Sequence, residues 1–329
     1  MRLNALLLSV AAAAAALAAP LDLTLPTDRL ASELTLPNNP LPFNGWYADP
    51  EIRQYDSIFW IFPTTSIAFE DQKWFSAFSS PDLINWTPYD GILAAWNFGW
   101  ARDSLWAPAS IRGTDGRYYL YFSANGLRSQ DATAGLGVGV SNQPEGPYMD
   151  ALGTRLVDSI VNGANPMDPD VFVDDDGVTY FYFGGSAVNV ALLNDDMISF
   201  RPFPDTNTTF KDITPSPSFV EGTKVFKRNG IYYMMWSENG YGDPTYQVAY
   251  GMSSSPLGLF TRRAVILWEN PNIAVATGHN GILNLPGTDE WYIVYHRRPL
   301  NETDPNHRQI AIDRLYFGEN GEVQTVIVT

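Results

Sequence analysis

The chain has 329 residues, of which 45% are hydrophobic and 17% charged, a composition typical of a globular protein with a sizeable core. Asp and Glu total 36 against 20 Lys and Arg, which gives a net charge of −16. This charge argues against a nucleic acid as partner, because no basic surplus is available to neutralise phosphates. Cysteine is absent, so disulfides, zinc thiolates and a cysteine nucleophile are excluded.

The N-terminus has the pattern of a secretory signal. Arg2 is followed by residues 3–17, which are nearly all apolar, and residues 16–18 fit a small-x-small cleavage site. We therefore predict a signal peptide over 1–18, a leader or linker over 19–40, and a secreted, extracellular protein. No later apolar run is long enough to predict a membrane span. Glycosylation is predicted at three N-x-S/T sequons: Asn85, Asn207 and Asn301.

The rest of the chain repeats itself. Five short aromatic runs, rich in β-forming residues, start 60, 62, 52 and 59 residues apart and are bounded by Gly, Asp or Asn. The runs are Ile58–Pro63, Tyr118–Ser123, Tyr180–Gly185, Tyr232–Ser237 and Trp291–His296. A second strand-like element precedes each run and a third follows most of them. The pattern predicts an all-β fold, a five-bladed β-propeller with four-stranded blades over residues 41–329. Two β-sandwich domains are the alternative.

One residue from each leading strand recurs at nearly the repeat length. Asp49, Trp106, Asp168, Glu221 and His279 are separated by 57, 62, 53 and 58 residues. Because the first strand of a blade lines the central channel, this register predicts that three carboxylates, a Trp and a His face one axis. Charged groups on innermost strands are costly unless they serve a site.

Three facing carboxylates suit the cleavage of a glycosidic bond. One carboxyl must hold its proton and donate it to the leaving oxygen, and a second must stay ionised to activate water. A third can tune the acid through its charge and hydrogen bonds. For any single carboxylate, a purely structural role at a strand end is the alternative.

These motifs resemble glycoside hydrolase family 43, a family of five-bladed β-propellers. The matching pieces are Tyr47–Pro50, Trp106–Pro108, Met167–Phe172, Glu221-Gly222 and Thr277–His279. The chain departs from many members in reading Glu221-Gly222-Thr223 and Gly278-His279-Asn280, which leaves every carboxylate in place. A retaining, invertase-like propeller is disfavoured because the chain has neither an Arg-Asp-Pro motif nor Cys.

The resemblance implies an inverting mechanism with three carboxylates in distinct roles. Asp49 is similar to the general base, Glu221 to the general acid, and Asp168 to the residue that modulates the pKa of the acid. Trp106, Met167 and Arg308 are predicted to bind substrate, with Arg297 and Arg298 as rivals of Arg308.

His279 has two interpretations. The resemblance implies that it helps to hold a structural Ca²⁺ in the central channel, although no cofactor is predicted to be required. A His that merely fills the channel is the alternative.

The expected function is exo-acting α-L-arabinofuranosidase activity on plant cell-wall polysaccharide. The partners would be arabinan, arabinoxylan or arabinogalactan side chains, bound by a monomer. Family alternatives are β-xylosidase, endo-arabinanase, exo-galactanase and galactofuranosidase. From other classes, a non-catalytic carbohydrate-binding propeller and a purely structural or interaction propeller remain open.

Overall fold

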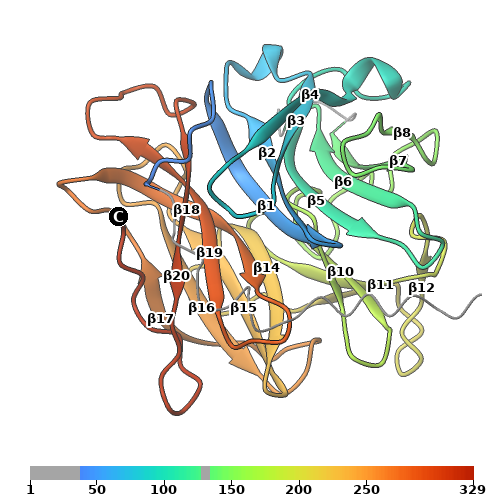
Figure 1. Cartoon of the computed structure of the whole chain (residues 1–329). Helices are drawn as coiled ribbons and strands as arrows, with labels where there is room; N and C mark the ends of the chain where they lie inside the picture. Colours follow the sequence, from blue (N-terminus) through green and yellow to red (C-terminus); the bar gives the residue numbers. More distant parts are fainter. Residues whose placement is uncertain (1–37, 127–133) are drawn as a thin grey trace, which may run out of the picture.

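The computed structural model describes residues 38–126 and 134–329 and shows five antiparallel sheets arranged around a central axis (Figure 1). The predicted β-propeller is therefore confirmed. The proposed signal peptide and nearly all of the leader lie outside the described residues. Within the described part of the chain, no helix combines the length and apolarity that a membrane crossing requires.

The strands follow the chain from blade to blade, and each blade runs from its innermost strand outward. Blade one contains β1 (Tyr47–Tyr55), β2 (Ile58–Thr65), β3 (Trp74–Ser80) and β4 (Thr87–Ala94). Blade two contains β5 (Trp106–Arg112), β6 (Tyr118–Ala124), β7 (Gly135–Ser141) and β8 (Met149–Asp150). Blade three contains β9 (Asp170–Val173), β10 (Thr179–Phe183), β11 (Asn189–Leu193), β12 (Phe200–Arg201) and β13 (Phe210–Asp212).

The last two blades complete the ring. Blade four contains β14 (Glu221–Arg228), β15 (Ile231–Glu238), β16 (Gln247–Ser253) and β17 (Thr261–Leu267). Blade five contains β18 (Ala274–Asn284), β19 (Trp291–Pro299) and β20 (Gln309–Leu315). Two short 3-10 helices, Phe69–Asp71 and Ala95–Asn97, lie in the connections of blade one and between blades one and two.

Three of the five sheets have the predicted four strands. Blade three has a fifth strand, because both β12 and β13 pair with β11. Blade five has three strands, and the segment before blade one lies along its outer strand: the Leu41 amide donates to the Ile310 carbonyl at 2.8 Å. The ring is thus closed by residues from near the two ends of the sequence, and β1 lies next to β18 in Figure 1.

The aromatic runs form the second strand of every blade and are almost entirely buried. Their side chains pack between adjacent blades; for example, Tyr121 of β6 meets Phe181 of β10 with ring centroids 5.2 Å apart. Five such apolar clusters hold the blades together. The core therefore leaves the innermost strands free to carry polar groups.

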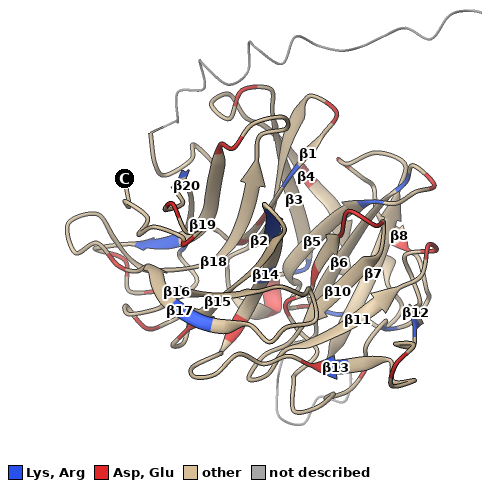
Figure 2. Ribbon diagram, turned by 90° about the horizontal axis from the view of Figure 1, so that it is seen from below, with Lys and Arg blue, Asp and Glu red and all other residues tan. Residues whose placement is uncertain are grey.

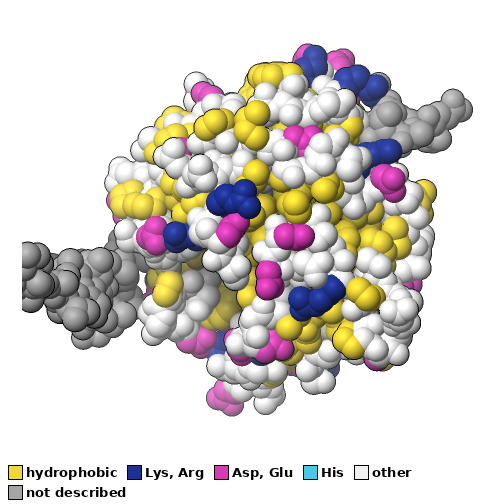
Figure 3. Space-filling model, turned by 90° about the vertical axis from the view of Figure 1, so that its right-hand side faces the viewer, with side chains coloured by type: hydrophobic (Ala, Val, Ile, Leu, Met, Phe, Trp, Pro, Cys, Tyr) yellow, Lys and Arg dark blue, Asp and Glu magenta, His cyan; other side chains and the backbone are white. Residues whose placement is uncertain are grey.

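The acidic surplus is spread over the surface. Figure 2 shows Asp and Glu mostly in connections and at strand ends, and Figure 3 shows acidic and basic side chains interspersed on one side of the molecule. All three sequon residues in the described part are exposed.

Candidate active site

The predicted register brings the site residues to one pocket, where the innermost strands begin. A cavity of about 350 Å³ is lined by side chains from all five blades and their connections. Its lining residues are Asp49, Phe69, Ser104, Trp106, Gly126, Met167, Asp168, Glu221, Tyr241, His279 and Arg308. Every residue that the sequence singled out for catalysis, sugar contact or metal binding is in this list, apart from the two rivals of Arg308. The volume lies at the small end of the range for ligand pockets.

A strained backbone turn places these side chains. The strand register shifts beside Asp49 and beside Trp106, Glu221 and His279, as in β-bulges. In each blade one residue at this level has a positive φ: Asp49 (47°), Ala107 (46°), Asp168 (50°), Gly222 (69°) and His279 (42°). For non-glycine residues this conformation costs on the order of 1–3 kcal/mol and is typical of functional sites.

The amide of each of these strained residues is bound by a side chain of the preceding blade. Four of the acceptors stand at the same position at the end of the aromatic runs: Thr64, Ser123, Ser237 and His296, at 2.8–3.2 Å. The equivalent position in blade three, two residues after Tyr182, is Gly184, which has no side chain. There the carboxylate of Asp168 itself accepts the Gly222 amide, at 3.0 Å.

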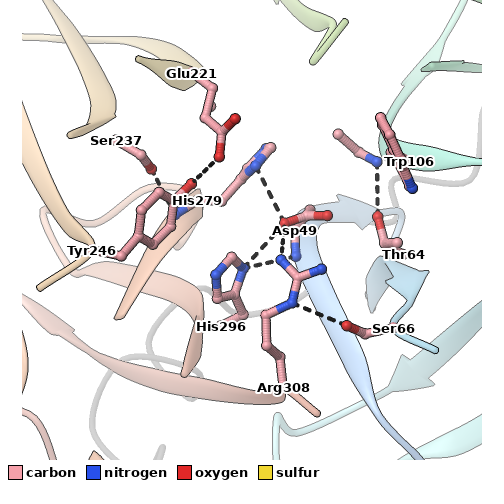
Figure 4. Close-up of polar contacts among 12 residues, drawn as sticks. Asp49, Thr64, Ser66, Trp106, Glu221, Ser237, Tyr246, His279, His296 and Arg308 are labelled. Carbon is pink, nitrogen blue, oxygen red and sulfur yellow. Dashed lines mark hydrogen bonds and ion pairs between the residues drawn. The ribbon is translucent and has the colours of Figure 1, made fainter. Parts of the chain in front are cut away.

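Asp49 is held as an anion. Arg308 Nη1 lies 3.2 Å from its Oδ1, and the Nδ1 atoms of His296 and His279 lie 3.1 and 3.4 Å from the same oxygen (Figure 4). Burial by itself raises the pKa of Asp49, but Arg308, His279 and His296 outweigh it, so that the pKa lies well below its usual range. An ionised carboxylate of this kind can accept a proton from water.

Glu221 and Asp168 have the opposite tendency. Burial raises the pKa of Glu221 to about 7, helped by the charge of Asp49 and opposed by a hydrogen bond from Tyr246. The Tyr246 hydroxyl donates to Glu221 Oε1 at 2.9 Å. Burial, Glu221 and Asp49 together hold the pKa of Asp168 well above its usual range. The pKa of one carboxyl is thus held low and the pKa values of the other two are raised, which separates a base from an acid.

Aromatic and aliphatic side chains form the walls. Trp106 donates its indole N–H to Gln72 Oε1, and Phe69 meets its ring edge-on with centroids 5.2 Å apart. Tyr241 covers Arg308, whose guanidinium carbon lies 4.9 Å from the ring centroid. Flat apolar surfaces beside charged groups suit a sugar ring with its hydroxyls.

The geometry distinguishes Arg308 from its rivals and gives His296 a place in the site. Arg308 lines the pocket and also bonds Ser66 Oγ at 3.0 Å, whereas its rivals do not line it: Arg298 donates to the Gly242 carbonyl and Arg297 to that of Thr329. His296 is completely buried against Asp49, so it positions the proposed base.

The residues around His279 do not fit a calcium site. Calcium takes roughly six to eight oxygen ligands. The Nδ1 atom of His279 instead faces Asp49 and, at 3.8 Å, Asp168 Oδ2. Among the described residues, no group of three or more His, Cys, Asp or Glu side chains could hold a metal ion.

Sequence reasoning missed Phe69, Tyr241 and Tyr246. Phe69 and Tyr241 come from connections between strands, outside the repeating register. Tyr246 is one residue before β16. No spacing rule in a single sequence points to them.

Comparisons with known proteins place this pocket in a family. The family model of glycosyl hydrolases family 43 matches residues 38–323. The chain is 42% identical to the β-D-galactofuranosidase xynD of Aspergillus niger, with 94% of this chain and 92% of that protein covered. A solved α-L-arabinofuranosidase from Clostridium thermocellum is similar with a TM-score of 0.70 and 29% identity, covering 88% of this chain and 96% of that one.

A third relative bears on the metal. A solved β-xylosidase/α-arabinofuranosidase from a compost microbial metagenome, described as a calcium-free form, has a TM-score of 0.70 and 26% identity, covering 87% of this chain and 96% of that one.

The family match covers most of the chain and agrees with the five blades and the carboxylate pocket. The protein therefore belongs to glycosyl hydrolases family 43 and is a glycoside hydrolase.

Proposed function

We propose that the protein is an exo-acting, inverting hydrolase of terminal furanosyl residues. The observation that carries the proposal is one small pocket in which the pKa of Asp49 is held low and that of Glu221 is raised, with Asp168 in the same lining. Glu221 donates its proton to the leaving oxygen, and Asp49 takes a proton from the water that attacks the sugar carbon. Asp168 raises the proton affinity of Glu221 through its proximity.

The sugar is proposed to be a β-D-galactofuranoside, with an α-L-arabinofuranoside as the second candidate. The relative at 42% identity supports the first and the arabinofuranosidase structure supports the second. The two furanosides share their ring configuration, and galactofuranose carries an additional hydroxymethyl group. The sequence-based preference for arabinofuranosidase activity stays a prediction.

The test is product release from nitrophenyl glycosides of β-D-galactofuranose, α-L-arabinofuranose and β-D-xylose, with the wild type and Glu221→Ala. We expect both furanosides to be cleaved, the galactofuranoside with the higher kcat/KM, and both activities to be lost in the variant. Cleavage of the xyloside alone would overturn the furanoside proposal and keep the mechanism. Release of the inverted anomer, followed by NMR, checks the stereochemistry.

A non-catalytic sugar-binding propeller predicts a different result. Glu221→Gln removes the acid while preserving the shape of the side chain, so a binding protein would keep its affinity and show no turnover in either form. A hydrolase loses about 10²- to 10⁴-fold in kcat. The loss is expected to be larger for a disaccharide than for a nitrophenyl glycoside, because the weaker leaving group depends more on the acid.

The biological setting remains a proposal from the sequence. We propose a secreted, glycosylated monomer that acts on arabinan, arabinoxylan or arabinogalactan side chains. Western analysis of culture medium, with and without removal of N-glycans, tests both secretion and glycosylation; retention inside the cell would contradict the first.

A further inference from the structure

A second layer of charge lies in the central channel, next to the catalytic carboxylates. The ammonium of Lys224 on β14 lies 2.7 and 3.1 Å from the two carboxylate oxygens of Glu51 on β1. It lies 2.8 Å from Oδ1 of Asp170 on β9. All three residues are at most 5% exposed, so the ammonium is enclosed between three innermost strands. A buried charge of this kind is costly unless it is fully paired.

This layer is in register with the active site. Glu51 and Asp170 each follow a catalytic carboxylate, Asp49 or Asp168, by two residues along the strand. Lys224 follows Glu221 by three. The charges of Lys224 and Asp170 also act on His279, so the layer is close to that imidazole.

The oxygens in the layer are already used. Both oxygens of Glu51 bond Lys224, and Glu51 also pairs with Arg53. One carboxylate oxygen of Asp170 accepts a hydrogen bond from Lys224, and the other accepts one from the Val225 amide at 2.8 Å. The two anionic side chains, Glu51 and Asp170, are balanced by two cationic ones, Lys224 and Arg53. A divalent cation would therefore find neither free ligands nor a negative charge to balance.

We propose that the Lys224 ammonium is the resident cation of the channel, so that neither the fold nor the active site requires a bound metal ion. Its removal leaves Glu51 and Asp170 facing a cavity with excess negative charge, which is a new site for Ca²⁺. The proposal goes beyond hydrolysis, and its readouts are metal content and thermal stability, so it stands or fails separately from the proposed activity.

The first experiment uses the native protein. After dialysis against EDTA, elemental analysis is expected to find far less than one equivalent of any divalent metal, and Tm is expected to equal that of the undialysed protein. Added CaCl₂ is expected to leave Tm unchanged. Retention of stoichiometric metal, or a lower Tm after EDTA, overturns the proposal.

The second experiment uses Lys224→Gln, with Lys227→Gln as the matched control. Lys227 lies on the same strand and pairs with Asp174 and Asp175 outside this layer. Breaking the buried pair is expected to lower Tm by roughly 5–10 °C without metal. CaCl₂ is expected to restore at least half of that loss in Lys224→Gln and to leave Lys227→Gln unchanged.

A double variant separates cation binding from general damage. Lys224→Met with Asp170→Asn leaves Glu51 paired with Arg53 and removes the excess charge, so this protein is expected to fold and to ignore CaCl₂. Folding of Lys224→Gln only in the presence of CaCl₂ supports the proposal. A wild-type Tm in Lys224→Gln, an equal calcium response in the double variant, or no folding of Lys224→Gln even with CaCl₂ overturns it.

Discussion

The joint between blades three and four differs from the other four joints of the ring. At those four, a hydroxyl or imidazole of the preceding blade binds the amide of a strained residue. At the exceptional joint Gly184 has no such group, and the carboxylate of Asp168 accepts the Gly222 amide. A structural hydrogen bond is thus made by a group that also belongs to the site.

The hydrogen bond to the Gly222 amide fixes Asp168 beside Glu221, which suits the proposed role of Asp168 in modulating the acid. Its carboxylate is fixed to the backbone immediately after Glu221, so its charge and position are coupled to that of the acid. A neutral Ser or Thr at the equivalent place would satisfy the amide but exert no such influence. The repeat therefore sets the backbone geometry of the joints. Because blade three has a glycine where the other blades have a polar side chain, the Asp168 carboxylate makes the hydrogen bond instead.

The largest effect is expected from breaking the exceptional joint itself. Asp168→Ala removes both the charge and the acceptor, whereas Asp168→Asn removes only the charge. Both are expected to lose about 10²-fold or more in kcat/KM, because the tuned acid contributes on that scale. Asp168→Asn is expected to have the higher Tm of the two, since the Gly222 amide keeps a partner. Full activity of Asp168→Asn would remove Asp168 from the mechanism.

The pH dependence of kcat/KM tests whether Asp168 interacts with Glu221. The pKa of Glu221 is raised to about 7, so kcat/KM is expected to fall as pH rises through that value and the acid loses its proton. The pKa of Asp49 is lowered, so no acidic limb is expected near the ordinary Asp value of about 3.9. In Asp168→Asn the alkaline limb is expected to move to lower pH, because a neighbouring acid has been removed. An unchanged limb would show that the two carboxyls do not interact.

Replacing Glu221 should change stability and activity in opposite directions. Glu221 binds its proton more tightly in the folded state than in the unfolded one, so its contribution to stability falls as pH rises from about 4.5 to about 7. Glu221→Gln removes this penalty and is expected to raise Tm at neutral pH by about 2–6 °C. At pH 4 the difference is expected to vanish. Calorimetry at the two pH values checks this, and a lower Tm at neutral pH would contradict it.

The smallest effects are expected at ordinary joints. Ser123→Ala and Thr64→Val each remove one buried hydrogen bond and are expected to cost about 1–2 kcal/mol of unfolding free energy in urea titrations. Because Ser123 holds Asp168 and Thr64 holds the residue after Trp106, the first is expected to lower kcat and the second to raise KM. The same kinetic change in both variants would contradict this division.

Much of this architecture could be predicted because it repeats. The period of the aromatic runs identified the second strands, and the residues leading them lie around one pocket as expected. The register is offset by one residue in blades two and four, where Ala107 and Gly222 adopt the positive φ that Asp49 adopts in blade one. Trp106 and Glu221, one residue before these positions, still line the pocket. The prediction from residue spacing was therefore correct despite the offset.

What could not be predicted comes from outside the repeat or from pairing across blades. Phe69 and Tyr241 reach the pocket from connections, whose shape a single sequence does not reveal. Nothing in the sequence distinguishes Lys224 from other strand residues, because its ion pairs with Glu51 and Asp170 join different blades. Its partners lie 173 and 54 residues away in the sequence, on other blades.

The bond between Leu41 and Ile310 has a consequence for the order of events during synthesis. A ribosome delivers the inner strand of blade one long before β20, so blade one must wait for its last neighbour while the other blades are made. During that interval the faces of β1 and of the segment before it are uncovered, and non-native contacts compete for them. Completion of the ring therefore comes late in synthesis, and the pocket, which takes residues from all five blades, is complete only then.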